Sequence, residues 1–299
     1  MFMRSFLVVL VLALVCNLAF AQEEEGQINP NSLLNIPRYE QLYKVRAWRV
    51  IDLREKQNKG FFSRGNEITR LVLKAINSGE LADIYERDSL TTKRSKEAFN
   101  ALMVTQQGEI FPTWEPNVDY YQGDPVTFNG KNYEAYVNNK GKNPTTSKDD
   151  WQATTRGQAV RYEASQIYRI TLQEDIIFDK RRSRLYHDMV AMEFAAYDDV
   201  TSTFKSLGWF KYKDLEKVFR NHPKEAIWFN RYNSAENKNY ADAFLLRLFH
   251  GPIDKVENPD DERIVDTYTA NQRPYREAVW AMEWEEMKLM EKEHNLWEY

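Results

Sequence analysis

Three carboxylates that could take part in acid–base chemistry, Glu174, Asp175 and Asp179, lie in one short stretch of the sequence. A general acid and a general base must reach the same substrate. The surrounding residues alternate between apolar and polar types, which predicts a β-strand, and neighbouring side chains of a strand point to opposite faces of a sheet. Glu174 and Asp175 would therefore be separated by the sheet, so this cluster predicts no paired acid–base site.

Histidine is the next residue type that could catalyse a reaction or bind a metal. The four histidines are His187, His222, His250 and His294. None has a partner at the spacing of a metal-binding motif, and no HExxH sequence occurs. The sequence also lacks a Gly-x-Ser-x-Gly elbow, a Walker loop and a Rossmann glycine run. We therefore expect a protein that is not an enzyme and that has no catalytic residues, metal or cofactor.

A third group of candidate residues is aromatic and lies in the segment 111–153. Val126 and Phe128 alternate into Asn129-Gly130, the strongest short hairpin turn, and the residues after it alternate out again. We expect a small, independently folded all-β insert with an aromatic core. The residues predicted to form that core are Trp114, Tyr121, Tyr133 and Trp151.

The insert resembles the small chitin-binding modules that are appended to chitinases and cellulases. The resemblance is carried by the pattern Y-x-G-D-x-V-x-F-x-G-K-x-Y-x-A from Tyr121 to Ala135, between two tryptophans. In that family exposed aromatic rings stack on sugar rings. The loop that usually carries those rings has no aromatic residue between Tyr136 and Trp151, which leaves Tyr120 and Tyr136 as possible platforms. Two interpretations stay open: a glycan contact, with peptidoglycan as the polymer, or a scaffold that contacts protein.

The elements that position these residues are a mixture of hairpins and helices. A helix is predicted between Asn66, a candidate cap, and Gly79, and an amphipathic helix that Gly251 closes is predicted later in the chain. An antiparallel hairpin is predicted over residues 167–189, with its turn in the sequence DKRRS. The type of residues 45–53 stays open. Because no βαβ alternation occurs, we expect an α+β fold of antiparallel hairpins packed with amphipathic helices.

The last 27 residues predict a long C-terminal helix with an apolar stripe. Trp280, Trp284, Met287 and Met290 recur at helical spacing, and the opposite face is rich in Glu and Lys. Such a stripe either packs into the core or receives a partner. Both interpretations stay open, and the candidate partner interface consists of Trp280, Trp284, Met287 and Trp297.

The N-terminal end has the layout of a secretory signal peptide over residues 1–21, and a retained membrane anchor is the alternative. Removal of this segment would remove Cys16, the only cysteine, so we expect no disulfide. Residues 22–38 are polar and Asn-rich, which predicts a flexible arm that orders on binding. Basic and acidic residues are interleaved along the 299-residue chain, so we expect no nucleic-acid partner.

Four extended motifs resemble, in this order, the gliding-motility protein N family (GldN, also PorN) of the type IX secretion machinery of Bacteroidetes. They are AWRVIDLREKQN from Ala47, QEDIIFDKRRSRL from Gln173, the long segment from Phe229 to Tyr268, and EHNLWEY from Glu293. The resemblance spans residues 39–110 and 154–299, which would form one α+β domain interrupted by the insert.

The resemblance implies a periplasmic structural subunit on the inner face of the outer membrane. It implies a ring formed with a GldK/PorK-like lipoprotein, and contacts with other subunits similar to GldL and GldM. Self-association in a ring needs repeating, heterologous contacts, which an arm and a terminal helix can supply. The alternative function is that of a periplasmic or surface protein that binds a peptidoglycan- or chitin-like glycan through the insert.

Overall fold

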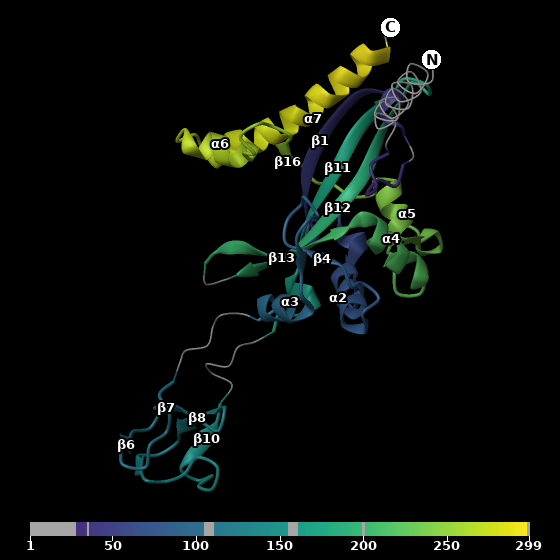
Figure 1. Ribbon diagram of the computed structural model, residues 1–299. Helices are drawn as coiled ribbons and strands as arrows, with labels where there is room; N and C mark the ends of the chain where they lie inside the picture. The colour runs from purple at the N-terminus through teal and green to yellow at the C-terminus, as the bar shows by residue number, and fades with distance from the viewer. Residues whose placement is uncertain (1–27, 35, 105–110, 155–160, 199–200, 298–299) are drawn as a thin grey trace, which may run out of the picture.

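The main body is built on one antiparallel sheet of seven strands (Figure 1). The computed structural model describes residues 28–34, 36–104, 111–154, 161–198 and 201–297. The strands follow the order β16-β1-β11-β12-β13-β4-β5. Their bounds are Ile253–Val256, Gln41–Asp52, Arg169–Asp179, Arg184–Asp198, Thr203–Lys211, Ile84–Tyr85 and Lys93–Arg94. The mixture of this sheet with helices confirms the predicted α+β class.

The centre of the sheet is the predicted hairpin of β11 and β12. Its turn lies at residues 180–183, where Ser183 adopts a positive φ of 48°, within the predicted sequence. The stretch of open type belongs to β1, which pairs with β11 from Gln41 opposite Asp179 to Asp52 opposite Arg169. These long registers fix which side chains share a face.

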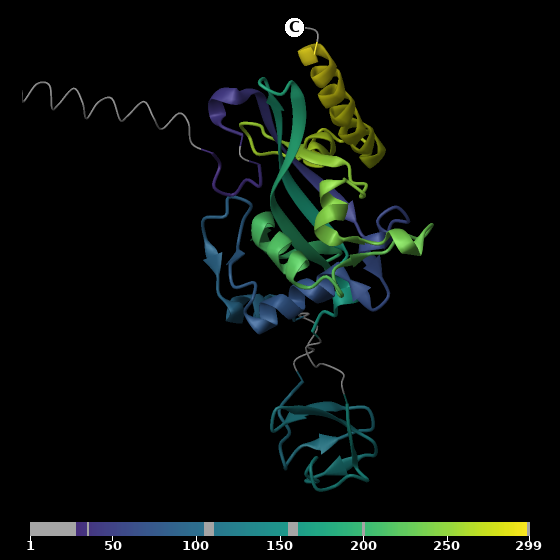
Figure 2. The ribbon, with the colours of Figure 1, turned by 90° about the vertical axis from the view of Figure 1, so that its right-hand side faces the viewer.

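The main core lies on one face of the sheet, under α2 (Ile68–Ser78), α4 (Tyr212–Asn221) and α5 (Tyr240–Leu245). Each helix turns an apolar face to the sheet, and Figure 2 shows them gathered near the lower end of the long strands. The buried residues that meet there include Ile170, Leu172, Phe194, Phe210, Leu71, Leu215 and Phe244. Helix α3 (Lys96–Leu102) contributes the buried Phe99.

Two short ladders lie beside these helices. Strand β2 (Phe62–Ser63) pairs with β3 (Asn66–Glu67), and β14 (Ile227–Trp228) pairs with β15 (Lys238–Asn239). The predicted cap at Asn66 is wrong: Asn66 belongs to β3, and its amide donates to the carbonyl of Ile227 at 2.9 Å. The predicted stop at Gly79 is confirmed by its left-handed φ of 83°.

The helix predicted to end at Gly251 is shorter than expected. Helix α5 ends at Leu245, because Arg247 takes a positive φ of 53°. Gly251 lies against β1 instead, where an added Cβ would come within 2.6 Å of the Val50 carbonyl oxygen. The glycine is therefore required by close packing rather than by a helix cap.

The chain ends in α6 (Ile264–Ala270) and the predicted long helix α7 (Tyr275–Trp297). Both helices contact β16, and α7 extends along the upper part of the sheet in Figure 1. Its buried residues are Ala278 and Met282, and Leu289 packs on a small cluster around Ile176 and Ile253. In the described parts of the chain, none of the helices combines the length and the apolar character needed to cross a bilayer.

The insert forms a separate lobe in Figure 1, joined to the body by two segments, 105–110 and 155–160, that lie outside the described residues. Strands β7 (Pro125–Phe128), β8 (Lys131–Ala135) and β10 (Trp151–Ala153) form its sheet, and β6 (Asp119–Tyr120) pairs with β9 (Asn139–Lys140). The predicted hairpin turn is confirmed by positive φ angles of 49° at Asn129 and 73° at Gly130.

The first prediction concerns that turn. Gly130→Val places a β-branched side chain at a positive φ, which costs about 1–3 kcal/mol, a large fraction of the stability of so small a lobe. We expect rapid proteolysis within residues 111–153 and an unchanged unfolding temperature of the main body. Lys131→Val is the matched control, because the same side chain then occupies a strand position. Equal protease resistance of both variants would contradict the role of the turn.

Candidate functional site

A cluster of buried charges forms around Glu174 of β11. Its carboxylate is fully buried and accepts from Nε of Arg49 at 2.5 Å and from Nη1 of Arg247 at 2.6 Å. Arg49, which is 4% exposed, also donates from Nη1 to Glu286 of α7 at 2.9 Å and to the carbonyl of Gly251 at 3.0 Å. The cluster therefore joins β1 and β11 to α7 and to the chain that follows α5.

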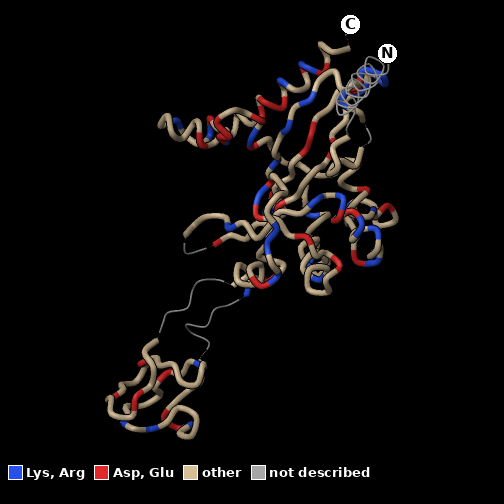
Figure 3. The backbone as a smooth tube through the Cα atoms, viewed as in Figure 1, with Lys and Arg blue, Asp and Glu red and all other residues tan. Residues whose placement is uncertain are grey.

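Asp175 lies on the opposite face of the sheet, as the strand alternation predicts. It pairs with Arg46 of β1 at 2.6 Å and with Lys44 at 2.8 Å. The cationic β1 and the acidic β11 are visible side by side in Figure 3. Asp179, at the end of β11, pairs with Arg182 of the turn at 2.6 Å. The three carboxylates serve separate ion pairs, and the structure does not bring them together.

The electrostatic setting keeps these acids ionised. Burial alone would raise the pKa of the Glu174 carboxyl, but His187, 3.6 Å away, and the two guanidinium groups outweigh burial and hold that pKa well below its usual range. Burial likewise opposes the charge of Asp175, and the hydrogen bonds from Arg46 and Lys44 lower its pKa. A carboxylate held ionised by fixed cations is a structural anchor rather than a proton donor. Among the described residues, no group of His, Cys, Asp and Glu could hold a metal ion.

The predicted flexible arm is partly anchored on the face of the sheet that carries Asp175. Asp188 of β12 accepts from the hydroxyl of Ser32 and, at 3.0 Å, from the backbone N–H of Leu33. Asn29 donates to Asp175 at 3.4 Å. Burial raises the pKa of Asp188, and the bonds from the arm oppose that shift. Residues 28–34 are therefore held by the body itself, whereas residues 22–27 lie outside the described residues.

The tryptophan stripe, which we define as Trp280, Trp284, Met287 and Met290, lies on the outer side of α7. These side chains are between 54% and 66% exposed, and Arg276 lies 4.9 Å from the Trp280 ring centroid. The side of α7 that contacts the sheet uses Ala278, Met282 and Leu289 instead. Trp297 is 56% exposed and meets the ring of Phe178 edge-on at 6.1 Å.

Helix α7 thus has apolar residues on two opposite sides. One side is covered by the sheet, and the other side is open within the described chain. Monomeric proteins seldom leave a contiguous apolar surface of this kind uncovered, and aromatic residues and Met are enriched where proteins meet. The stripe therefore does not pack into the core formed by the described residues, and of the two interpretations this geometry favours a partner surface.

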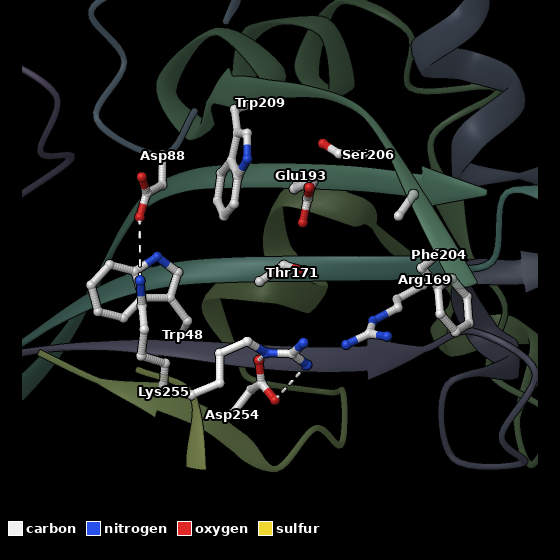
Figure 4. Close-up of a pocket in the computed structure, with 12 residues that line it drawn as sticks. Trp48, Asp88, Arg169, Thr171, Glu193, Phe204, Ser206, Trp209, Asp254 and Lys255 are labelled. Atoms are coloured by element: carbon white, nitrogen blue, oxygen red, sulfur yellow. Dashed lines mark hydrogen bonds and ion pairs between the residues drawn. The ribbon is translucent and has the colours of Figure 1, made fainter. Parts of the chain in front are cut away.

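A cavity of about 260 Å³ lies on the sheet face opposite the main core (Figure 4). Its floor is Thr171, and Trp48 and Trp209 stand at one end. Arg169 forms no ion pair among the described residues, and burial and the charge of Arg263 lower its pKa. Arg263 is itself paired with Asp254 at 2.6 Å. The cavity can hold a small polar group, but the two Trp rings are only 8% exposed, so they offer no stacking surface.

The sequence alone did not reveal this cavity, because its lining comes from segments far apart in the chain. The signal that was available is the alternation of β11, which places Arg169 and Thr171 on one face. No local sequence motif predicts a cavity whose lining is brought together by the sheet.

In the insert, the burial of two neighbouring tyrosines is the reverse of the prediction: Tyr120 is buried and Tyr121 is exposed. Tyr120, expected as a stacking platform, is 6% exposed; its ring meets Trp151 edge-on at 5.2 Å, and its hydroxyl accepts from the N–H of Glu115 at 2.7 Å. Tyr121, expected in the core, is 63% exposed. The core is formed by Tyr120, Val126, Tyr133, Ala135 and Trp151, with Trp114 and Phe128 packed against it.

Tyr136 is exposed, as expected of a platform, at 58%. It borders a hollow of about 230 Å³ that is also lined by Gln122, Glu134 and Gln152. Tyr121 immediately precedes this lining in sequence. The aromatic residues available to a sugar ring in the described insert are therefore Tyr121 and Tyr136.

The second prediction tests the buried cluster. Glu174→Gln removes the charge that Arg49 and Arg247 face, so we expect a loss of about 3–5 kcal/mol of unfolding free energy in denaturant titrations at pH 7. Glu286→Gln removes the other acid of Arg49, but Glu286 is 48% exposed, so this control should lose less than about 1 kcal/mol.

The pH dependence provides a second readout. The pKa of Glu174 is lower in the folded protein than in the unfolded chain, where it is about 4.3. The stability that the ionised Glu174 contributes is therefore complete above a pH of about 4.3 and is lost as the pH falls toward the pKa of the folded state. The stability of the Glu174→Gln variant should therefore fall less steeply with acid than that of the natural protein. Equal losses in both Gln variants, with parallel pH profiles, would contradict the account.

The comparisons with known proteins agree with the motifs. The family model described as gliding motility associated protein GldN matches residues 36–298, and the chain belongs to that family. No curated protein matches the chain.

Proposed function

We propose that this GldN-family protein is a structural subunit of the type IX secretion and gliding motility machinery. In this proposal the protein is exported to the periplasm, lies at the inner face of the outer membrane and forms a ring with a GldK/PorK-like lipoprotein. Membership in a gliding motility family supports the machinery. The observation that carries the assembly role is the exposed tryptophan stripe of α7.

The stripe has the composition of an interface centre. Trp residues dominate the binding energy of many interfaces, and Met adapts to irregular partner surfaces. The apolar contacts of Ala278, Met282 and Leu289 hold the opposite side of α7 on the body, and Glu286 adds a pair with the buried Arg49. A helix fixed in this way loses little conformational freedom on binding, which favours affinity. The lipoprotein, rather than a second copy, is the partner that we assign to the stripe.

The third prediction tests this assignment. Trp284 is 54% exposed, so Trp284→Ala should change the unfolding free energy by less than about 1 kcal/mol, far below the loss expected for a buried tryptophan. Its affinity for the lipoprotein should fall about thirtyfold, equivalent to about 2 kcal/mol at an interface centre. Co-purification from cell envelopes and titration with the isolated lipoprotein would measure both effects.

Tyr275→Ala is the matched control, since Tyr275 is 64% exposed on the same helix but outside the stripe. It should leave binding unchanged. If both variants retain the lipoprotein equally well, the stripe is not the interface.

A second candidate function is a contact with peptidoglycan through the insert. The observation that favours it is the pair of exposed tyrosines, Tyr121 and Tyr136, near a hollow lined by polar side chains. Apolar faces of N-acetylglucosamine rings stack on such aromatic surfaces. The contact would hold the ring close to the cell wall without any catalytic step.

The fourth prediction uses sedimentation of the full-length exported chain with insoluble peptidoglycan and, separately, with chitin. Tyr121→Ala/Tyr136→Ala should reduce the bound fraction at least fivefold. Tyr232→Ala is the control, because Tyr232 is an exposed tyrosine outside the insert. Failure of the natural protein to sediment with either polymer would leave the insert as a scaffold or protein contact.

A further inference from the structure

Two adjoining hollows, of about 550 and 490 Å³, lie at the end of the sheet body beyond the last residue of β1. Both are lined by Lys59, Phe229 and Arg231. We call them together the basic groove. Their remaining lining comprises Lys56, Gln57, Gly60, Phe62, Ser63, Arg64, Glu67, Ser165, Trp228, Asn230 and Tyr232.

The charges of the basic groove are not balanced. Lys56, Lys59, Arg64 and Arg231 are exposed, and none of them forms an ion pair with another described residue. The one carboxylate in the lining, Glu67, is buried and lies 3.1 Å from Nε of Arg70 outside the groove. A concave surface with several uncompensated cations attracts an anionic ligand.

The lining of the basic groove is rich in aromatic residues. Trp228 lies against Gly60 so closely that a Cβ there would come within 2.3 Å of the indole, and Phe229 donates its N–H to the Gly60 carbonyl at 2.9 Å. Tyr232, also in the lining, is 88% exposed, with the guanidinium carbon of Arg231 5.3 Å from its ring centroid. Hollows lined by both cations and aromatic rings suit an extended peptide that carries acidic side chains better than they suit a flat membrane surface.

The chain itself contains such a peptide. Glu23, Glu24 and Glu25 are consecutive in the sequence and precede the anchored residue Asn29. We propose that this acidic segment of one copy binds in the basic groove of a neighbouring copy. The inference rests on the proposed ring, and it names the contact between successive GldN-family subunits.

The positions of the arm and the groove favour a neighbouring copy over the same chain. Asn29 anchors the arm to Asp175, which faces Arg46, and six residues of β1, about 20 Å, separate Arg46 from the strand end beyond which the groove lies. Glu23 lies six residues before Asn29, so a fully extended segment of about 22 Å is used up along the strand before it can pass to the other side of the sheet. Figure 2 shows the first described residues, in purple, on one side of the sheet and the light-green segment around Ser234–Glu236 on the other. Such a head-to-tail contact is heterologous and repeats around a ring.

A charge exchange tests the proposal on the full exported chain. One variant carries Lys59→Glu/Arg231→Glu, and the other carries Glu23→Lys/Glu24→Lys/Glu25→Lys. Each alone should weaken self-association at least tenfold in sedimentation velocity or mass photometry, whereas an equimolar mixture of the two should recover association to within about threefold of the natural protein. Lys213→Glu/Lys224→Glu is the control for net charge, because both lysines are exposed on or beside α4.

Failure of the mixture to recover association would overturn the proposal, as would unchanged association of the groove variant. The same variants are tested on vesicles with about 30% anionic lipid; loss of vesicle binding in the groove variant without recovery in the mixture would assign the groove to a membrane instead. Binding of the lipoprotein should be normal in the groove variant. If it is normal while self-association never depends on the groove, the groove proposal fails and the proposed secretion role stands.

Discussion

The arrangement of the body depends on the pairing of Arg49 with Glu174. Removing either charge from water costs several kcal/mol, and the geometry offsets this cost only because each group has more than one partner. Glu174 is shared by Arg49 and Arg247, and Arg49 also reaches Glu286 and the Gly251 carbonyl. This demand for partners specifies where α7 and the segment after α5 must lie. Arg247, whose guanidinium pairs with this carboxylate, lies at a positive φ of 53° just after α5.

The position of α7 on the sheet decides which of its side chains are buried and which stay exposed for the proposed contact. Small or flexible residues, Ala278 and Met282, face the sheet and allow the helix to approach closely, whereas the large indole rings of Trp280 and Trp284 remain outside. A helix that served only its own fold would place its largest apolar side chains inward, because burial of each contributes about 2–3 kcal/mol. The proposed partner would complete the burial of the outward tryptophans.

The sequence predicts those parts of the fold that depend on local chemistry. The β11–β12 hairpin, the Asn129-Gly130 turn and the long helix α7 follow from alternation, turn residues and helical spacing. Parts that depend on tertiary contacts are missed. Tyr120 and Tyr121 exchange roles because a shift of one residue along a strand reverses the face, and only the packing against Trp151 decides which ring is buried.

The sequence predicts which residue types form the candidate surfaces, but not where the fold places them. The spacing of Trp280 and Trp284 defines a stripe, but the burial of Ala278 and Met282 and the packing of Leu289 show which side of the helix is covered. The cations of the basic groove are scattered between Lys56 and Arg231 and share no motif, so their proximity emerges from the fold.

The central claim is that the outer side of α7 contacts another subunit. Site-specific photo-crosslinking in living cells, with a benzophenone amino acid at position 284 or 287 and at position 282 for comparison, tests it most directly. Adducts containing the lipoprotein from positions 284 and 287 but not from 282 are expected; adducts from 282 alone, or from none of the three, would contradict the account.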